Sequence, residues 1–125
     1  MSRRRILFVD DELQVLEGLR DLLWRHRRQL ELHFATGGNA ALLALRQKPF
    51  DVVVADLRMP GMDGATLLER VQQEHPGVRR IILSGEAERA TMQRALGVAD
   101  GFVGKPCDLS VLLAAIATGS GWPTQ

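Results

Sequence analysis

The chain has 125 residues, 46% of them apolar and 25% charged, which is the profile of one globular domain large enough to bury a hydrophobic core. Its 16 Lys and Arg nearly balance its 15 Asp and Glu, so the formal net charge of +1 creates no overall field that would attract nucleic acid or an anionic membrane. The one cysteine, Cys107, cannot form an internal disulfide, and with three histidines the chain lacks four Cys or His ligands at the spacing of a structural zinc site.

The sequence predicts neither export nor insertion into a membrane. The apolar run after the basic first residues covers only residues 6–9 before two aspartates interrupt it, which is too short for a signal peptide. No stretch approaches the roughly 18 uninterrupted apolar residues of a membrane-spanning helix. Together with the cysteine usage, these patterns lead us to expect a cytoplasmic location.

Strands and helices alternate in the predicted order of elements. The apolar run at 6–9 predicts a strand buried on both faces, and leucines at helical spacing predict an amphipathic helix from 12 to about 28. The elements predicted next are a strand at 31–35, a helix at 40–46, a strand at 52–55, a helix at 64–75, a strand at 81–83, a helix at 88–95, a strand at 101–103 and a helix from 108 to about 118. This alternation predicts a parallel sheet with helices on both faces, the doubly wound α/β architecture. We expect one domain over 1–118, followed at 119–125 by a flexible tail or the start of a linker.

Polar residues follow four of the predicted strands. Asp10 and Asp11 come after the first strand, Asp56 after the third, Ser84 after the fourth, and Lys105 two residues after the fifth. Ligands bind at the carboxyl ends of the strands in open parallel sheets, so these residues are the candidate site. If the first and third strands are neighbours, three carboxylates converge there and a hard cation would relieve their repulsion. Oxygen ligands alone suit Mg²⁺ or Mn²⁺.

Each residue also has a simpler explanation. Asp10 or Asp11 could cap the following helix, Asp56 could belong to a turn, Ser84 could begin an ordinary loop, and Lys105 could be a solvated lysine. None of these explanations predicts that all of them fall at carboxyl ends of strands.

The motifs resemble the receiver domain of two-component response regulators over nearly the whole chain. They are, in order, Val9-Asp10-Asp11-Glu12, Asp56-Leu57-Arg58-Met59-Pro60-Gly61-Met62-Asp63-Gly64, Ser84-Gly85 and Lys105-Pro106. The resemblance implies a flavodoxin-like fold of three layers, with five parallel strands in the order 2-1-3-4-5 and five helices.

The resemblance also implies roles for the acids. Asp56 would be the phosphoacceptor, a carboxylate nucleophile that attacks phosphorus and forms an acyl phosphate. Asp11, Asp56 and the backbone carbonyl of Arg58 would bind Mg²⁺, and Asp10 would hold a coordinated water.

Other residues would sense the phosphoryl group. Lys105 would place its charge on a phosphoryl oxygen, and the Ser84 hydroxyl would donate a hydrogen bond to it. The Lys105-Pro106 bond would be cis. Phe102 matches the switch aromatic of the family and would repack the face formed by the fourth helix, fifth strand and fifth helix; alternatively it is an ordinary core residue. Arg58 and Glu86 would flank the phosphoryl group, where their opposite charges could pair across it, hinder an attacking water and so tune its lifetime; alternatively they form only an exposed ion pair.

The resemblance implies a phosphorylation-dependent switch and not a conventional turnover enzyme. Its expected partners are a sensor histidine kinase or phosphotransfer protein, a downstream output domain or protein, and a second copy of the chain on phosphorylation, with no direct contact to nucleic acid. One alternative is a phosphorylation-independent interaction module. A phosphatase of the haloacid dehalogenase type would require Asp-x-Asp after the first strand, and a flavodoxin-like cofactor module would require a Ser, Thr and Gly-rich loop where this chain has Asp10-Asp11-Glu12.

Overall fold

A computed structural model describes residues 3–117 and contains the predicted alternation of strands and helices. The elements are β1 (Arg4–Val9), α1 (Leu13–Leu23), the 3-10 turn η1 (Trp24–His26), β2 (Leu30–Ala35), α2 (Gly38–Gln47), β3 (Val52–Ala55), α3 (Gly64–Glu74), β4 (Arg79–Ser84), α4 (Arg89–Leu96), β5 (Gly101–Gly104) and α5 (Leu109–Ala117). All paired strands are parallel, in the order β2-β1-β3-β4-β5. The predicted fold class and strand order are confirmed. Thr118 and the predicted tail at 119–125 lie outside the described residues.

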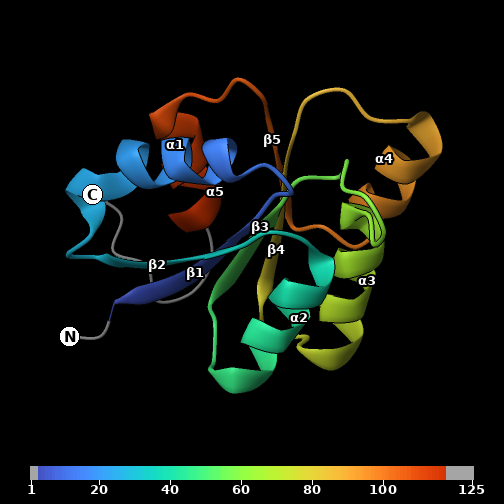
Figure 1. Cartoon of the computed structure of the whole chain (residues 1–125), viewed down its shortest axis with the longest axis horizontal. Helices are drawn as coiled ribbons and strands as arrows, with labels where there is room; N and C mark the ends of the chain where they lie inside the picture. The colour runs from blue at the N-terminus through green and yellow to red at the C-terminus, as the bar shows by residue number, and fades with distance from the viewer. Residues whose placement is uncertain (1–2, 118–125) are drawn as a thin grey trace.

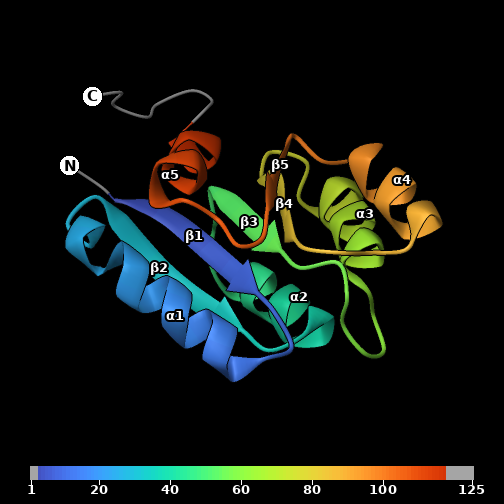
Figure 2. The ribbon, with the colours of Figure 1, turned by 90° about the horizontal axis from the view of Figure 1, so that it is seen from above.

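The sheet lies between two layers of helices (Figure 1), and an apolar core fills the space on each of its faces. Side chains alternate along a strand, so Leu7 and Val9 of β1 face the core under α2, α3 and α4, whereas Ile6 and Phe8 face the core under α1 and α5. Figure 2 shows α1 and α5 on one side of the sheet and α2, α3 and α4 on the other. Burial on both faces explains why β1 and β3 are uninterrupted apolar runs in the sequence.

The first helix ends earlier than its sequence pattern predicted. We expected it to reach about residue 28, but α1 ends at Leu23 and one 3-10 turn follows. The backbone N–H and the guanidinium of Arg27 both donate to the Trp24 carbonyl, at 3.2 and 2.9 Å. The turn buries no residue, so no core face extends the helix beyond Leu23.

Three strands begin earlier than predicted: β2 by one residue, at Leu30, and β1 and β4 by two residues each, because arginines take part in the ladder. Arg4 and Arg5 belong to β1, and Arg79 and Arg80 to β4. Their backbones pair with neighbouring strands. The guanidinium groups of three of them donate to backbone carbonyls: Arg5 to Pro49 at 2.7 Å, Arg79 to Ala115 at 3.0 Å and Arg80 to Val98 at 2.6 Å. Charged residues at a strand's entrance are therefore compatible with pairing here.

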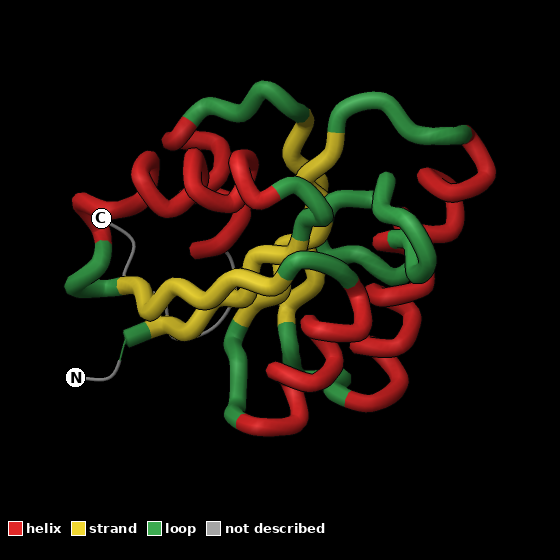
Figure 3. Tube along the Cα trace, viewed as in Figure 1, coloured by secondary structure: helices red, strands yellow, loops and turns green. Residues whose placement is uncertain are grey.

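The parallel arrangement brings the carboxyl ends of the strands to one edge of the sheet, where loops connect to the helices (Figure 3). No helix within residues 3–117 is long and apolar enough to cross a membrane.

Candidate functional site

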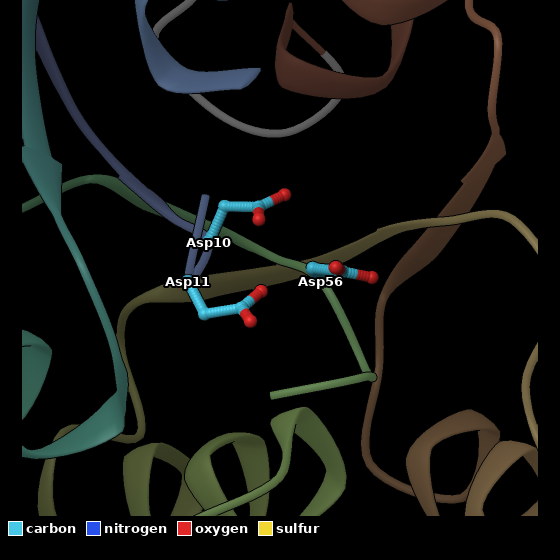
Figure 4. A group of neighbouring side chains, drawn as sticks. All are labelled: Asp10, Asp11 and Asp56. Carbon is cyan, nitrogen blue, oxygen red and sulfur yellow. The ribbon is translucent and has the colours of Figure 1, made fainter. Parts of the chain in front are cut away.

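Three carboxylates meet at the carboxyl edge of the two central strands. Asp10 and Asp11 follow β1, and Asp56 follows β3, which pairs directly with β1; the Asp56 N–H donates to the Val9 carbonyl at 3.0 Å. One carboxylate oxygen from each residue lies within 4.8 Å of the others. Figure 4 shows the three side chains extending in the same direction from these strand ends. The predicted convergence of the acids is confirmed.

The acids differ in their surroundings. Asp10 is only 2% exposed, Asp56 is buried as well, and Asp11 is exposed to solvent. Asp10 accepts a hydrogen bond from the Glu12 N–H at 3.0 Å, and the position that caps α1 is Glu12, which forms no side-chain cap bond. Neither Asp10 nor Asp11 therefore occupies the N-cap position of α1, although Asp10 binds the backbone N–H of the residue that does.

Lys105 supplies the positive charge of the site from the loop after β5. Its Nζ lies 2.9 Å from Asp10 Oδ2 and 3.5 Å from Asp56 Oδ2. Burial lowers the pKa of Lys105, but the hydrogen bond to Asp10 and the charges of Asp56 and Asp10 outweigh it, so the pKa lies above its usual value of 10.5. Lys105 is thus a protonated partner of the acids and not a solvated lysine. The Lys105-Pro106 bond is cis, as expected.

Ser84 is the last residue of β4 and is 1% exposed. Its hydroxyl donates to Asp56 Oδ1 at 3.0 Å, and the backbone N–H of Arg58 lies 3.5 Å from the same oxygen. Asp56 therefore receives the serine hydroxyl on one oxygen and the lysine charge on the other. The alternative that Ser84 merely begins a loop does not fit this burial and contact.

A hollow of about 720 Å³ opens beside the acids, between the β3–α3 loop and the β4–α4 loop. Arg58 and Glu86 both line it, together with Asp11, and both are exposed. No ion pair joins Arg58 to Glu86 in the part of the chain that the structure describes. Their effect on phosphoryl lifetime stays a prediction.

Phe102 lies on β5 with 47% of its surface exposed, so it is not a core residue in this structure. Leu96 of α4 and Val111 of α5 are exposed apolar side chains as well. These three residues lie on the elements predicted to form the output face, which we term the α4-β5-α5 face.

Sequence reasoning missed how closely the start of α3 lies to Asp56. Asp63 caps this helix by accepting from the Thr66 N–H at 2.8 Å, and the Gly64 N–H donates to the Leu57 carbonyl at 3.0 Å. A Cβ on Gly64 would lie 2.1 Å from the Asp56 carbonyl oxygen. An aspartate directly before a helix, here Asp63, is a common N-cap residue and could have been identified from the sequence. Nothing in the local sequence indicated the contact at Gly64.

The charges and donor types of the site fit a hard divalent cation. Three carboxylates and one ammonium leave a formal charge of −3 + 1 = −2 at the edge of the sheet. All acid donors are oxygen atoms, the ligand type that Mg²⁺ prefers, and they are already close enough to share one ion.

Sequence comparisons with known proteins identify relatives among the response regulators. The family model of the response regulator receiver domain matches residues 6–117. Response regulator protein PilR of Pseudomonas aeruginosa is 35% identical over 120 residues, which cover 94% of this chain and 26% of PilR. DNA-binding transcriptional regulator NtrC of Salmonella typhimurium is 37% identical over 120 residues, which cover 93% of this chain and 24% of NtrC. The chain spans about a quarter of the length of these two relatives.

Solved structures agree with the sequence comparison. The signal receiver domain of an HD domain-containing protein from Pseudomonas fluorescens Pf-5 superposes with a TM-score of 0.85 at 33% identity, covering 92% of each chain. A CheY-like receiver domain protein from Methanospirillum hungatei JF-1 has a TM-score of 0.84 at 28% identity, covering 92% of this chain and 91% of that one. With the family model matching nearly the whole chain, the protein belongs to the receiver domains of two-component response regulators.

Proposed function

We propose that this domain is a switch operated by phosphorylation of Asp56. The observation that carries the proposal is the convergence of the Ser84 hydroxyl and the Lys105 ammonium on the two oxygens of one buried carboxylate, beside two further acids. In the proposed step an Asp56 oxygen forms a bond to phosphorus, while the bond from phosphorus to the donor's nitrogen or oxygen breaks and that donor atom keeps the electron pair. The donor would be a sensor histidine kinase or a phosphotransfer protein.

Asp10, Asp11, Asp56 and the backbone carbonyl of Arg58 would hold Mg²⁺, or Mn²⁺ in its place. When bound, the cation would offset the carboxylate repulsion and the charge on the incoming phosphoryl group. The support for this set is the short separation of the carboxylate oxygens and the absence of nitrogen or sulfur donors among them.

Lys105 and Ser84 would change partners when the phosphoryl group arrives. The group adds about −1.5 to −2 charge and three acceptor oxygens at Asp56. Lys105, now 3.5 Å from the Asp56 carboxylate, would pair with a phosphoryl oxygen, and Ser84 would give up its bond to Asp56 to donate to another. Phe102 would turn inward as Ser84 moves, and so change the exposed apolar surface of the α4-β5-α5 face.

That face would contact the output domain or a downstream protein, and a second phosphorylated copy is a further expected occupant. Receivers act as signalling domains rather than as conventional enzymes, and we infer that this one catalyses only its own phosphorylation and dephosphorylation.

Arg58 and Glu86 would hinder water at the phosphoryl group, since both line the adjacent hollow. Arg58→Ala and Glu86→Ala are expected to shorten the phosphoryl lifetime, and unchanged dephosphorylation rates in both would remove this role.

Intact mass after incubation with Mg²⁺ and acetyl phosphate tests the proposal. We expect one phosphoryl group per chain, absent in Asp56→Asn and absent when a chelator removes the cation. An unmodified wild-type chain that also fails to bind Mg²⁺ would contradict the proposal and favour a phosphorylation-independent interaction module.

A further inference from the structure

One arginine connects α4 to the first turns of α3. Arg94 of α4 places Nη2 2.9 Å from Glu69 Oε1 and 2.9 Å from Thr66 Oγ1, and Nη1 lies 3.5 Å from Asp63 Oδ2. A second contact to Glu69 runs from Nε to Oε2 at 3.4 Å. The planar guanidinium thus contacts three residues of α3 and its cap with one rigid group.

This connection matters because the apolar packing of α4 is limited. Within α4, all of which the structure describes, Ala95 is the one fully buried residue, and Met92 packs half-buried against the core. The hollow beside the acids borders its amino end, where Glu88 and Thr91 line it together with Asp63. The polar contacts of Arg94 therefore add to the limited apolar packing that holds this short helix.

The other end of the connection leads to the phosphoacceptor. Asp63, which Arg94 contacts, also caps α3, and the next residue, Gly64, packs against the carbonyl oxygen of Asp56 too closely for a Cβ. The first turn of α3 is therefore fixed to the end of β3. Arg94 attaches α4 to this first turn of α3. The β4–α4 loop, which follows Ser84, leads directly into α4.

We infer that Arg94 latches α4 to the start of α3 and so favours the resting arrangement, in which Ser84 stays on Asp56. The inference rests on the proposed phosphorylation of Asp56. Movement of Ser84 toward a phosphoryl oxygen pulls on the β4–α4 loop, and any displacement of α4 breaks contacts of the guanidinium. Loss of the latch shifts the population toward the phosphorylated arrangement.

The variants that test the latch are Arg94→Gln and Asp63→Ser. The serine keeps a good helix cap but removes the charge that Arg94 contacts. Arg70→Gln is the matched control: Arg70 forms an exposed pair with Glu74 at 2.7 Å inside α3 and takes no part in the contact with α4. All three substitutions remove one surface charge.

Two measurements on the whole chain decide the inference. Amide hydrogen exchange without a phosphodonor should accelerate over residues 86–96 in Arg94→Gln and Asp63→Ser, and not in Arg70→Gln. The rate of phosphorylation by acetyl phosphate with Mg²⁺ should rise about two- to fivefold in the same two variants, as expected for the loss of a small ion-pair network, with Mg²⁺ affinity unchanged.

The outcomes separate the two proposals. Equal phosphorylation rates in Arg94→Gln and wild type overturn the latch while leaving the phosphoacceptor in place, whether or not exchange changes. A wild-type chain that takes no phosphoryl group overturns both. Faster phosphorylation in Arg70→Gln as well would assign the effect to surface charge and overturn the latch.

Discussion

Replacing Gly64 by alanine is expected to destabilise the domain and to impair phosphorylation together. The new Cβ would lie 2.1 Å from the Asp56 carbonyl oxygen and 2.8 Å from two further backbone atoms, where contacts under 3.0 Å are essentially never seen. The start of α3 must therefore move away by at least 3.0 − 2.1 = 0.9 Å. The obstacle is backbone on a buried strand end, so no side chain can rotate aside. We expect a loss of about 2–4 kcal/mol in the free energy of unfolding, from the upper half of the usual range for overpacking a core to slightly above it.

Gly18→Ala is the matched control for this substitution. Gly18 lies inside α1, and a Cβ there meets nothing within 4 Å. We expect this variant to gain about 0.5–1 kcal/mol, because alanine favours the helix over glycine. Urea unfolding followed by circular dichroism gives both values, and intact mass with acetyl phosphate gives the phosphorylation rate. A Gly64→Ala protein as stable as wild type would refute the packing argument.

Three further predictions follow from the contacts of charged and polar groups. Ser84→Ala should lower the free energy of unfolding by about 1–3 kcal/mol, because it removes the buried hydroxyl that donates to Asp56. Urea unfolding measures this loss, and a change below the error of the fit would contradict the contact. Lys105→Met should lower the free energy of unfolding by about 1–3 kcal/mol, because it leaves the buried Asp10 carboxylate without its partner. Added Mg²⁺ should recover part of this loss, and an equal loss with and without Mg²⁺ would argue against a cation at the acids. Hydrogen bonds with Arg5 and then His33 lower the pKa of Glu31 from 4.5 to about 2, so the stabilisation from these contacts is complete above pH 4.5 and is lost as pH falls toward 2. The midpoint of thermal unfolding should therefore fall less steeply over that interval in Glu31→Gln than in wild type, and parallel slopes would contradict the shift.

The sheet and the acid cluster could be predicted from the sequence because both follow from simple periodicities. Strands buried on both faces are unbroken apolar runs, as at 52–55, and parallel strands place whatever follows them at one edge. The convergence of Asp10, Asp11 and Asp56 further required the first and third strands to be neighbours, which the resemblance to receiver domains implied and the pairing of β1 with β3 confirms. Lys105 and Ser84 followed from the same rule.

Contacts between exposed side chains of different helices could not be predicted in this way. Arg94 and Glu69 are 25 positions apart, and charged residues on helix surfaces leave no periodic signal that pairs one with another. The dual role of Asp63, which caps α3 and contacts Arg94, is equally invisible without the packing of α4 on α3. The early end of α1 depends on the last residue that the core buries, Leu23. The basic residues that follow in the sequence do not by themselves indicate that end.

The bond between Lys105 and Asp10 joins residues 95 positions apart, and this distance determines when the site is completed as the protein is made. All three carboxylates have been synthesised by residue 56, whereas their positive partner comes 105 − 56 = 49 residues later. A nascent chain that ends before β5 carries the acids without this counter-ion. The ribosome must therefore release nearly the whole domain before the resting site can form.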